Sequence, residues 1–273
     1  MNNRWLMGVA AATLTVATAV AAQAADLPTR KEAPAPVFVP PPFTWTGFYI
    51  GANAGAVWSS GSATTTGYAA GFPVLAINWP TGSNGGGNTG FIGGGQAGYN
   101  WQTGQFVLGV ETDFDGTSLS RNKSIIGPGF IDPFGHNDFL TSNGSEKLNW
   151  LGSTRARVGY AVTSDNRLMI YGTGGFAYGG GNEHLNVFDT NNGWLWYNSQ
   201  SKTRTGWTIG GGVEYAITYN ITLRAEYLYY DLGSQTLTTT GNIAALNAFP
   251  GSFASTKVNF DGSVVRAGVN YKF

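Results

Sequence analysis

The chain has 273 residues, equal numbers of acidic and basic residues (15 each) and no cysteine. Zero net charge argues against a nucleic-acid partner, because binding to phosphates requires a basic surface. The absence of cysteine excludes a disulfide scaffold and thiol chemistry. Charged residues make up only 11% of the chain, whereas glycine (41 residues) and aromatic residues (14%) are abundant. This composition is typical of a β protein with an aromatic excess.

The N-terminus has the features of an export signal. Arg4 precedes an apolar segment over residues 6–22, and Ala22-Gln23-Ala24 fits the A-x-A cleavage pattern. We therefore expect residues 1–24 to be a signal peptide that is removed from the mature protein. The alternative, a single anchoring helix, is disfavoured because the segment is Ala- and Thr-rich and only weakly hydrophobic.

A proline-rich stretch, PTRKEAPAPVFVPPP, follows at residues 28–42. Proline removes backbone hydrogen-bond donors and favours extended polyproline II structure. We therefore expect residues 25–44 to be a periplasmic linker and residues 45–273 to be the folded domain.

Eight segments with a period of two follow in chain order. In each, an apolar and aromatic row alternates with a row of glycine, polar and charged residues, as in a β-strand whose faces meet different environments. The segments lie at 46–58, 90–101, 104–116, 148–161, 167–179, 205–217, 221–231 and 263–273. Each is close to the length of about 9–11 residues that a tilted transmembrane strand requires.

The connections between these segments alternate in length. Short turns are expected at 102–104, 163–166 and 218–220, and long loops at 59–88, 118–146, 180–203 and 231–257. Short turns on one rim and long loops on the other are typical of outer-membrane barrels. We therefore predict an all-β, eight-stranded antiparallel transmembrane β-barrel of up-and-down topology.

Charged residues of the segments fall on the row opposite the apolar one. We expect this row to face a narrow lumen, in which oppositely charged side chains pair to form a salt-bridged plug. The predicted lumen charge network consists of Glu111, Asp113, Asp115, Arg155, Arg157, Glu214, Arg224, Glu226, Arg266 and Lys272. The alternative, a solvated face of an ordinary sheet, does not explain equal numbers of acids and bases or the aromatic residues at the segment ends.

Candidate chemistry is sparse. The two histidines, His136 and His184, fall in expected loops and lack partners at metal-ligand spacing. The Gly-rich runs at 85–95 and 172–181 lack the Gly-Lys-Ser/Thr ending of a phosphate-binding loop. We predict no catalytic residues, no metal site and no cofactor.

The third long loop holds an aromatic cluster, Trp194, Trp196 and Tyr197. Exposed aromatic side chains can mark binding sites, so these residues are recognition candidates. An equally weighted alternative is that they fold over the barrel mouth as a lid.

Several motifs together resemble a known family. These are ADLP after the signal, then WTGFYIGANAG, LGSTRARVGYA, GWTIGGGVEYAIT, LRAEYLYYDLG and the terminal VRAGVNYKF. The chain resembles the small outer-membrane immunogenic proteins of alpha-proteobacteria, often labelled porin-family proteins with an OmpA-like barrel domain. The resemblance implies an outer-membrane barrel, surface-exposed loops and recognition of the C-terminal aromatic, Phe273, by the barrel assembly machinery.

We expect an outer-membrane protein with a structural envelope role, exported through its signal peptide and in contact with lipid and lipopolysaccharide. Two alternatives remain open: a passive pore for small solutes, and a binding or adhesion module that meets an extracellular partner through its loops. No nucleic-acid partner and no enzymatic activity are expected.

Overall fold

The computed structural model describes residues 42–68, 88–127, 129–131, 135–189 and 191–273. The predicted signal peptide and most of the predicted linker lie outside these residues. The long strands are β1 (Gly47–Ser59), β3 (Thr89–Thr103), β4 (Phe106–Ile126), β7 (Thr141–Ala161), β8 (Leu168–Phe188), β9 (Leu195–Ala216), β10 (Ile221–Thr238) and β12 (Phe253–Lys272). The short elements are β2 (Ala63–Tyr68), β5 (Phe130–Ile131), β6 (Asn137–Asp138), β11 (Thr240–Gly241) and the helix α2 (Ile243–Ala248).

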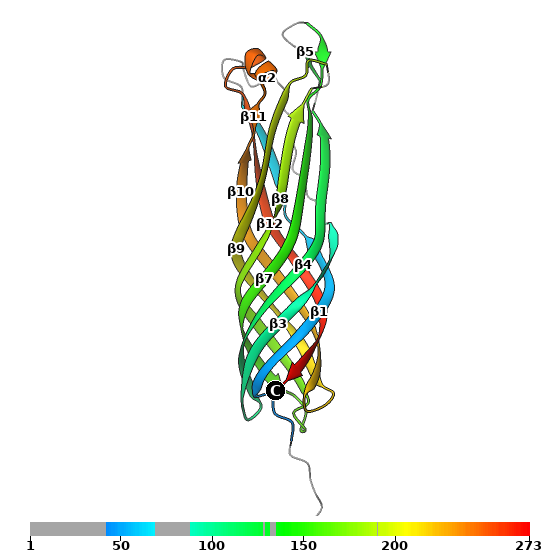
Figure 1. Ribbon diagram of the computed structural model, residues 1–273, viewed down its shortest axis with the longest axis vertical. Coiled ribbons are helices and arrows are strands. Elements are labelled where there is room, and N and C mark those ends of the chain that lie inside the picture. The colour runs from blue at the N-terminus through cyan, green and yellow to red at the C-terminus, as the bar shows by residue number, and fades with distance from the viewer. Residues whose placement is uncertain (1–41, 69–87, 128, 132–134, 190) are drawn as a thin grey trace, which may run out of the picture. The chain divides into compact units, whose positions relative to one another are not determined.

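The eight long strands form a closed antiparallel ring. The order is β1-β3-β4-β7-β8-β9-β10-β12, and β12 pairs back with β1. Ring neighbours follow one another along the chain, which gives the predicted up-and-down, barrel-like topology (Figure 1). The C-terminus lies at one end of the ring, whereas β5, β11 and α2 lie at the other end (Figure 1). No helix among the described residues is both long and apolar enough to cross a membrane.

The short turns are where the alternation predicted them. Gly104 (φ 62°), two residues before β4, and Asn166 (φ 58°), two residues before β8, adopt the left-handed conformation that tight turns demand. The long connections are shorter than predicted, because strands continue into them. Parts of 118–146, 180–203 and 231–257 belong to extended β4, β7, β8, β9, β10 and β12. These extensions lack the outward apolar row on which the strand prediction depended.

Bulges separate the two parts of the ring. The β4–β7 ladder shifts register between Gly116 and Leu119, and the β7–β8 ladder shifts between Leu148 and Trp150. Because the bulge adds a residue, Leu148 packs against the inner apolar cluster instead of joining the outward row predicted for it. Below the bulges, inward residues such as Asp115 are charged; above them, inward residues such as Leu119 are apolar.

Candidate functional site

The predicted charge network fills the middle of the ring, and Glu111 on β4 is its centre. Its carboxylate accepts hydrogen bonds from Arg155 at 2.6 Å and Arg224 at 2.5 Å, and lies 3.3 Å from Arg157. Glu111 lies directly opposite Arg155 across the β4–β7 ladder, as the segment order predicted. The exposed fraction of Glu111 is 2%, so these contacts replace water around a buried charge.

A second group of contacts joins the remaining strands. Arg266 on β12 donates to Asp115 at 2.6 Å, to Asp113 at 2.9 Å and to Glu226 at 2.9 Å. Arg155 also reaches Asp113 and Glu226, so the two arginines share both carboxylates. The network therefore ties β4, β7, β10 and β12 together through the interior.

Neutral side chains complete the network. Tyr49 donates its hydroxyl hydrogen to Glu111 at 2.6 Å, Tyr171 donates to Glu226 at 3.1 Å, and Asn270 donates to Glu214 at 2.8 Å. A Cβ at Gly98 would collide with the Tyr49 hydroxyl, so this inward glycine makes room for the tyrosine. The sequence analysis selected only charged residues for this network. Tyr49 and Asn270 also lie on the inward row of the alternation, and this position could have identified them as members.

Lys272 does not belong to the network, contrary to the prediction. It is the last residue of β12, and its Nζ lies 3.4 Å from the carbonyl oxygen of Thr46 and 5.3 Å from the centre of the Phe43 ring. Parity places Lys272 on the inward row, but its position at the strand end takes it to the mouth of the ring. The network consists of five carboxylates and four arginines: Glu111, Asp113, Asp115, Glu214 and Glu226 with Arg155, Arg157, Arg224 and Arg266.

The mouth near the C-terminus is closed by residues that precede β1. Phe43 and Trp45 are 2% and 1% exposed and pack edge to face at 4.9 Å. Trp45 donates its indole hydrogen to the carbonyl of Asn166 at 2.8 Å, and both rings join an apolar cluster with Met169 and Tyr171. Phe43 falls within the segment predicted as linker, and the sequence analysis did not assign it a position in the fold.

Above the network the interior is apolar. The inner apolar cluster comprises Val57, Ile92, Leu119, Leu151, Ala177, Leu228, Tyr230, Leu232, Leu237, Val258, Phe260 and Val264. A cavity between this cluster and the charge network has a volume of about 10 Å³, which is about the volume that one water centre needs. The middle of the ring is therefore filled.

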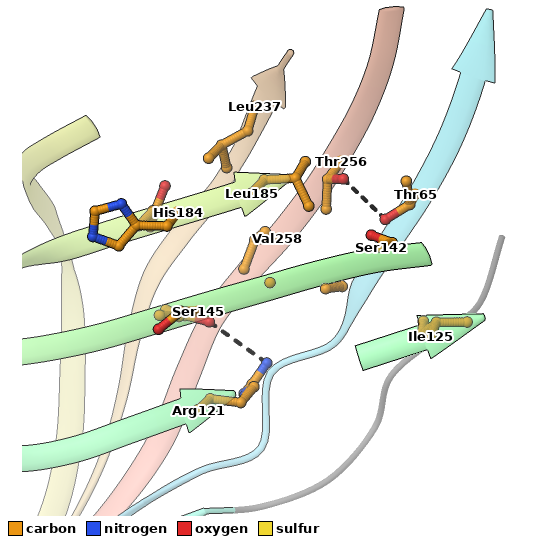
Figure 2. Close-up of a pocket in the computed structure, with 14 residues that line it drawn as sticks. Thr65, Arg121, Ile125, Ser142, Ser145, His184, Leu185, Leu237, Thr256 and Val258 are labelled. Carbon is orange, nitrogen blue, oxygen red and sulfur yellow. Dashed lines mark hydrogen bonds and ion pairs between the residues drawn. The ribbon is translucent and has the colours of Figure 1, made fainter. Parts of the chain in front are cut away.

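A cavity of about 70 Å³ lies further towards the far end. Figure 2 shows Leu185, Leu237 and Val258 on its apolar side, and the hydrogen bond between Thr65 and Thr256 at its rim. Arg121 lines it as well and pairs with Glu146 at 3.7 Å. Burial raises the pKa of the Glu146 carboxyl above its ordinary value, although Arg121 acts in the opposite direction.

Two of the three aromatic recognition candidates are buried. Trp194 and Trp196 are 3% and 0% exposed and pack with Phe249 in a small core among the loops. Trp196 donates its indole hydrogen to Ser252 at 3.0 Å. These two side chains are therefore inaccessible for surface recognition. Tyr197 remains exposed at 57%.

The two histidines lie in different segments of the structure. His184 is an exposed residue of β8, rather than a loop residue, and pairs with Ser145 and Ser199 of the neighbouring strands. His136 is an exposed residue before β6. Within the described part of the chain, no group of three or more His, Cys, Asp or Glu residues is arranged to hold a metal ion.

The outer surface of the ring has the predicted apolar row. Leu108, Val110 and Phe114 are 53%, 61% and 59% exposed, whereas the intervening acids are buried. Aromatic residues form two girdles. The girdle near the C-terminus contains Tyr99, Trp101, Tyr160, Tyr215 and Tyr271, and the other contains Trp58, Trp150, Tyr178 and Trp207.

A ring of antiparallel strands with an apolar exterior and a charge-filled interior defines the class of small outer-membrane barrel proteins. The chain belongs to the outer membrane protein beta-barrel domain family, whose model matches residues 10–273. This assignment, with the relatives below, confirms the predicted family and the location in the cell outer membrane.

Two relatives support the assignment. The chain is 38% identical to the 31 kDa outer-membrane immunogenic protein of Brucella melitensis, an alignment that covers 98% of this chain and 100% of the relative. It is 34% identical to the 22 kDa outer membrane protein of Rhizobium leguminosarum bv. viciae, over 64% of this chain and 63% of the relative. Both names are those of outer-membrane proteins rather than enzymes.

Among solved structures, the chain resembles the outer membrane protein OprG from Pseudomonas aeruginosa. The TM-score is 0.43 at 12% sequence identity, and the match covers 85% of this chain and 98% of that one.

Proposed function

We propose that the protein is an eight-stranded β-barrel that crosses the outer membrane, has a closed lumen and serves a structural role in the envelope. The observation that carries this proposal is the polarity of the ring between the two girdles, where charged side chains lie inside and apolar side chains lie outside. Four arginines and five carboxylates are buried inside the ring, and an apolar row faces outward on the same strands. Such an arrangement is stable in hydrocarbon and unstable in water.

The spacing of the girdles supports a transmembrane position. Trp150 and Tyr160 belong to opposite girdles on β7. Their separation of about ten residues, on a strand tilted by about 40°, corresponds to a height of about 25 Å. This is the height of the apolar band of outer-membrane barrels.

The filled interior supports a structural role rather than a passive pore. Three successive layers block the ring: the Phe43–Trp45 pair, the charge network and the inner apolar cluster. An ion that entered would have to displace paired charges from contacts such as the 2.6 Å bond between Arg155 and Glu111. We therefore assign no conductance to the resting barrel.

The remaining parts complete the proposal. Residues 1–24 direct export, residues 25–42 act as a periplasmic linker that ends before the buried Phe43, and Phe273 is recognised by the barrel assembly machinery. Phe273 is 65% exposed at the end of the chain, and its backbone N–H donates to Phe48 at 3.0 Å. Tyr197 is the member of the aromatic cluster that is accessible to an extracellular partner.

One sample tests these statements together. The full chain, folded in detergent, should migrate differently on gels before and after boiling, and should then show no single-channel steps in planar bilayers. Spin labels at Leu108 and Val213 should contact acyl chains, because both positions are exposed outward at 53% and 47%. Discrete conductance steps would favour the pore, and labels that contact water would contradict the transmembrane position.

A further inference from the structure

The strand extensions carry an ordered polar surface on their outer side. Beyond the girdle that contains Trp150 and Trp207, the outward residues of β4, β7, β8 and β9 align across the ladders in three rows, which we name the polar face. The row nearest the girdle contains Ser120, Lys147, Asn182 and Ser201. The middle row contains Asn122, Ser145, His184 and Ser199. The far row contains Ser124, Asn143, Asn186 and Tyr197.

The middle and far rows line a shallow depression. Its volume is about 440 Å³, and its lining includes Asn143, His184 and Asn186. These three side chains form no side-chain hydrogen bond to another residue that the structure describes. Asn143 lies opposite Asn186 across the β7–β8 ladder, and His184 lies two residues from Asn186 on β8. Amide and imidazole groups offer both donors and acceptors. Such an array suits a ligand with many hydroxyl groups.

The third observation is an exposed aromatic at the end of the far row. Tyr197 lies next to Asn186 across the β8–β9 ladder and is 57% exposed. A phenol ring combines an apolar face with a polar tip, so it packs against the C–H face of a sugar ring while the amides bind the hydroxyls.

Charge and height indicate where such a ligand is anchored. Lys147 is exposed in the row nearest the girdle, only three positions along β7 from Trp150. Each further row lies about 5–7 Å farther from the girdle. The three rows contain no acidic residue among these twelve positions. The surface thus presents an apolar band, then a cation, then neutral polar groups.

We infer that the polar face binds the phosphorylated glycolipid of the outer leaflet, lipopolysaccharide, with acyl chains on the apolar band, a phosphate at Lys147 and sugars over Asn143, His184 and Asn186. This inference depends on the proposed transmembrane position and names the site for one expected partner. The order of the three layers on the protein matches the order of tail, anion and sugar in such a lipid.

The opposite side of the extension supplies a matched control surface. There the outward residues of β10 and β12 include Thr236, Thr238, Ser255 and Lys257. These four residues offer hydroxyl groups and a lysine, but no amide, imidazole or phenol group. Its variants therefore report on general polarity and charge.

The test uses the full chain folded in detergent and three probes: intact lipopolysaccharide, its lipid A part without further sugars, and the delipidated polysaccharide. The triple variant Asn143→Ala/His184→Ala/Asn186→Ala should lower affinity for intact lipopolysaccharide by about tenfold or more, since each lost hydrogen bond contributes about 0.5–1.5 kcal/mol. Its affinity for lipid A should stay within about twofold of the unchanged protein. Lys147→Ala should weaken binding of both lipids, and Thr236→Ala/Thr238→Ala should change neither.

Wild-type affinity of the triple variant for intact lipopolysaccharide would overturn the inference, as would an equal loss in the control variant. Equal affinity for the delipidated polysaccharide would overturn the assignment to a membrane lipid. The variant Asn143→Asp/Asn186→Asp provides a second readout, because added negative charge should repel the phosphorylated lipid. A wild-type chain that lacks heat-dependent gel mobility would contradict the proposed function instead, so the two failures are distinguishable.

Discussion

The lower and upper parts of the ring are built on the same strands with opposite polarity. Between the girdles, β4 presents Val110 outward and Glu111 inward; beyond the bulge it presents Asn122 outward and Leu119 inward. The lower part has the polarity required in lipid, and the upper part has the polarity of a protein in water. One strand therefore carries both polarities, and the bulge between Gly116 and Leu119 marks the point where they exchange.

The two interiors hold together by different physics. In the charge network, each group has specific hydrogen-bonded partners, and removal of one breaks several buried ionic contacts at once. In the inner apolar cluster, stability depends on buried apolar area and on packing, so another apolar side chain of similar volume is tolerated. Substitutions that separate charge from shape distinguish the two regions.

The largest expected effect is the loss of the network's central carboxylate. Glu111→Gln keeps the shape but leaves Arg155, Arg157 and Arg224 without their shared partner. We expect the free energy of unfolding to fall by about 3–5 kcal/mol, measured by urea denaturation in detergent. Asp165→Asn, at a position whose side chain is 58% exposed, is the control and should cost less than about 1 kcal/mol. Equal losses in the two variants would show that the buried network stabilises the fold no more than an exposed carboxylate does.

The outer surfaces should differ next. Val110→Lys places a cation on the apolar band and should cost about 2–4 kcal/mol. Ser124→Lys, on the same strand above the girdle, should change the free energy of unfolding by less than about 0.5 kcal/mol. The readout is urea denaturation of the protein folded into lipid vesicles. A similar cost at both positions would contradict the change of solvent along β4.

Conservative exchanges sharpen the comparison of the interiors. Leu228→Met in the inner apolar cluster nearly conserves volume and should cost less than about 1.5 kcal/mol. Arg155→Lys keeps the charge, but lysine lacks the planar fork that reaches Glu111, Asp113 and Glu226. It should cost about 2 kcal/mol or more, measured as above. The opposite order would mean that charge alone holds the network.

The smallest expected effect is the pH dependence of stability that Glu146 contributes, beyond the girdle that contains Trp150. Because burial raises the pKa of Glu146 above 4.5, the contribution of this residue to stability is greatest at pH below 4.5 and is lost as pH rises through the pKa in the folded protein. The unfolding temperature should therefore fall less steeply in Glu146→Gln than in the unchanged protein as pH rises through that pKa. An unchanged pH profile in the variant would indicate that Glu146 is not the responsible group.

Most of the charge network was predictable, because parity is a local property of a strand. The alternation assigned Glu111, Arg155 and Arg266 to one side, and closure of the ring made that side an interior. The aromatic pair at the mouth was not predictable in this way. Phe43 follows prolines and belongs to no strand, so nothing in the periodicity assigns it to the lumen.

By itself, the sequence determined which side chains face inward between the girdles and the order of the strands that carry them, because a period of two and short turns are local features. The tertiary structure decided the rest. It placed Lys272 outside the charge network and added tyrosine and amide side chains to that network. It also buried Trp194 and Trp196 in a loop core and extended the strands beyond the bulges. These outcomes depend on which residues meet across the closed ring. Contacts between segments that are distant in the chain produce no periodic pattern in the sequence, so the alternation could not predict them.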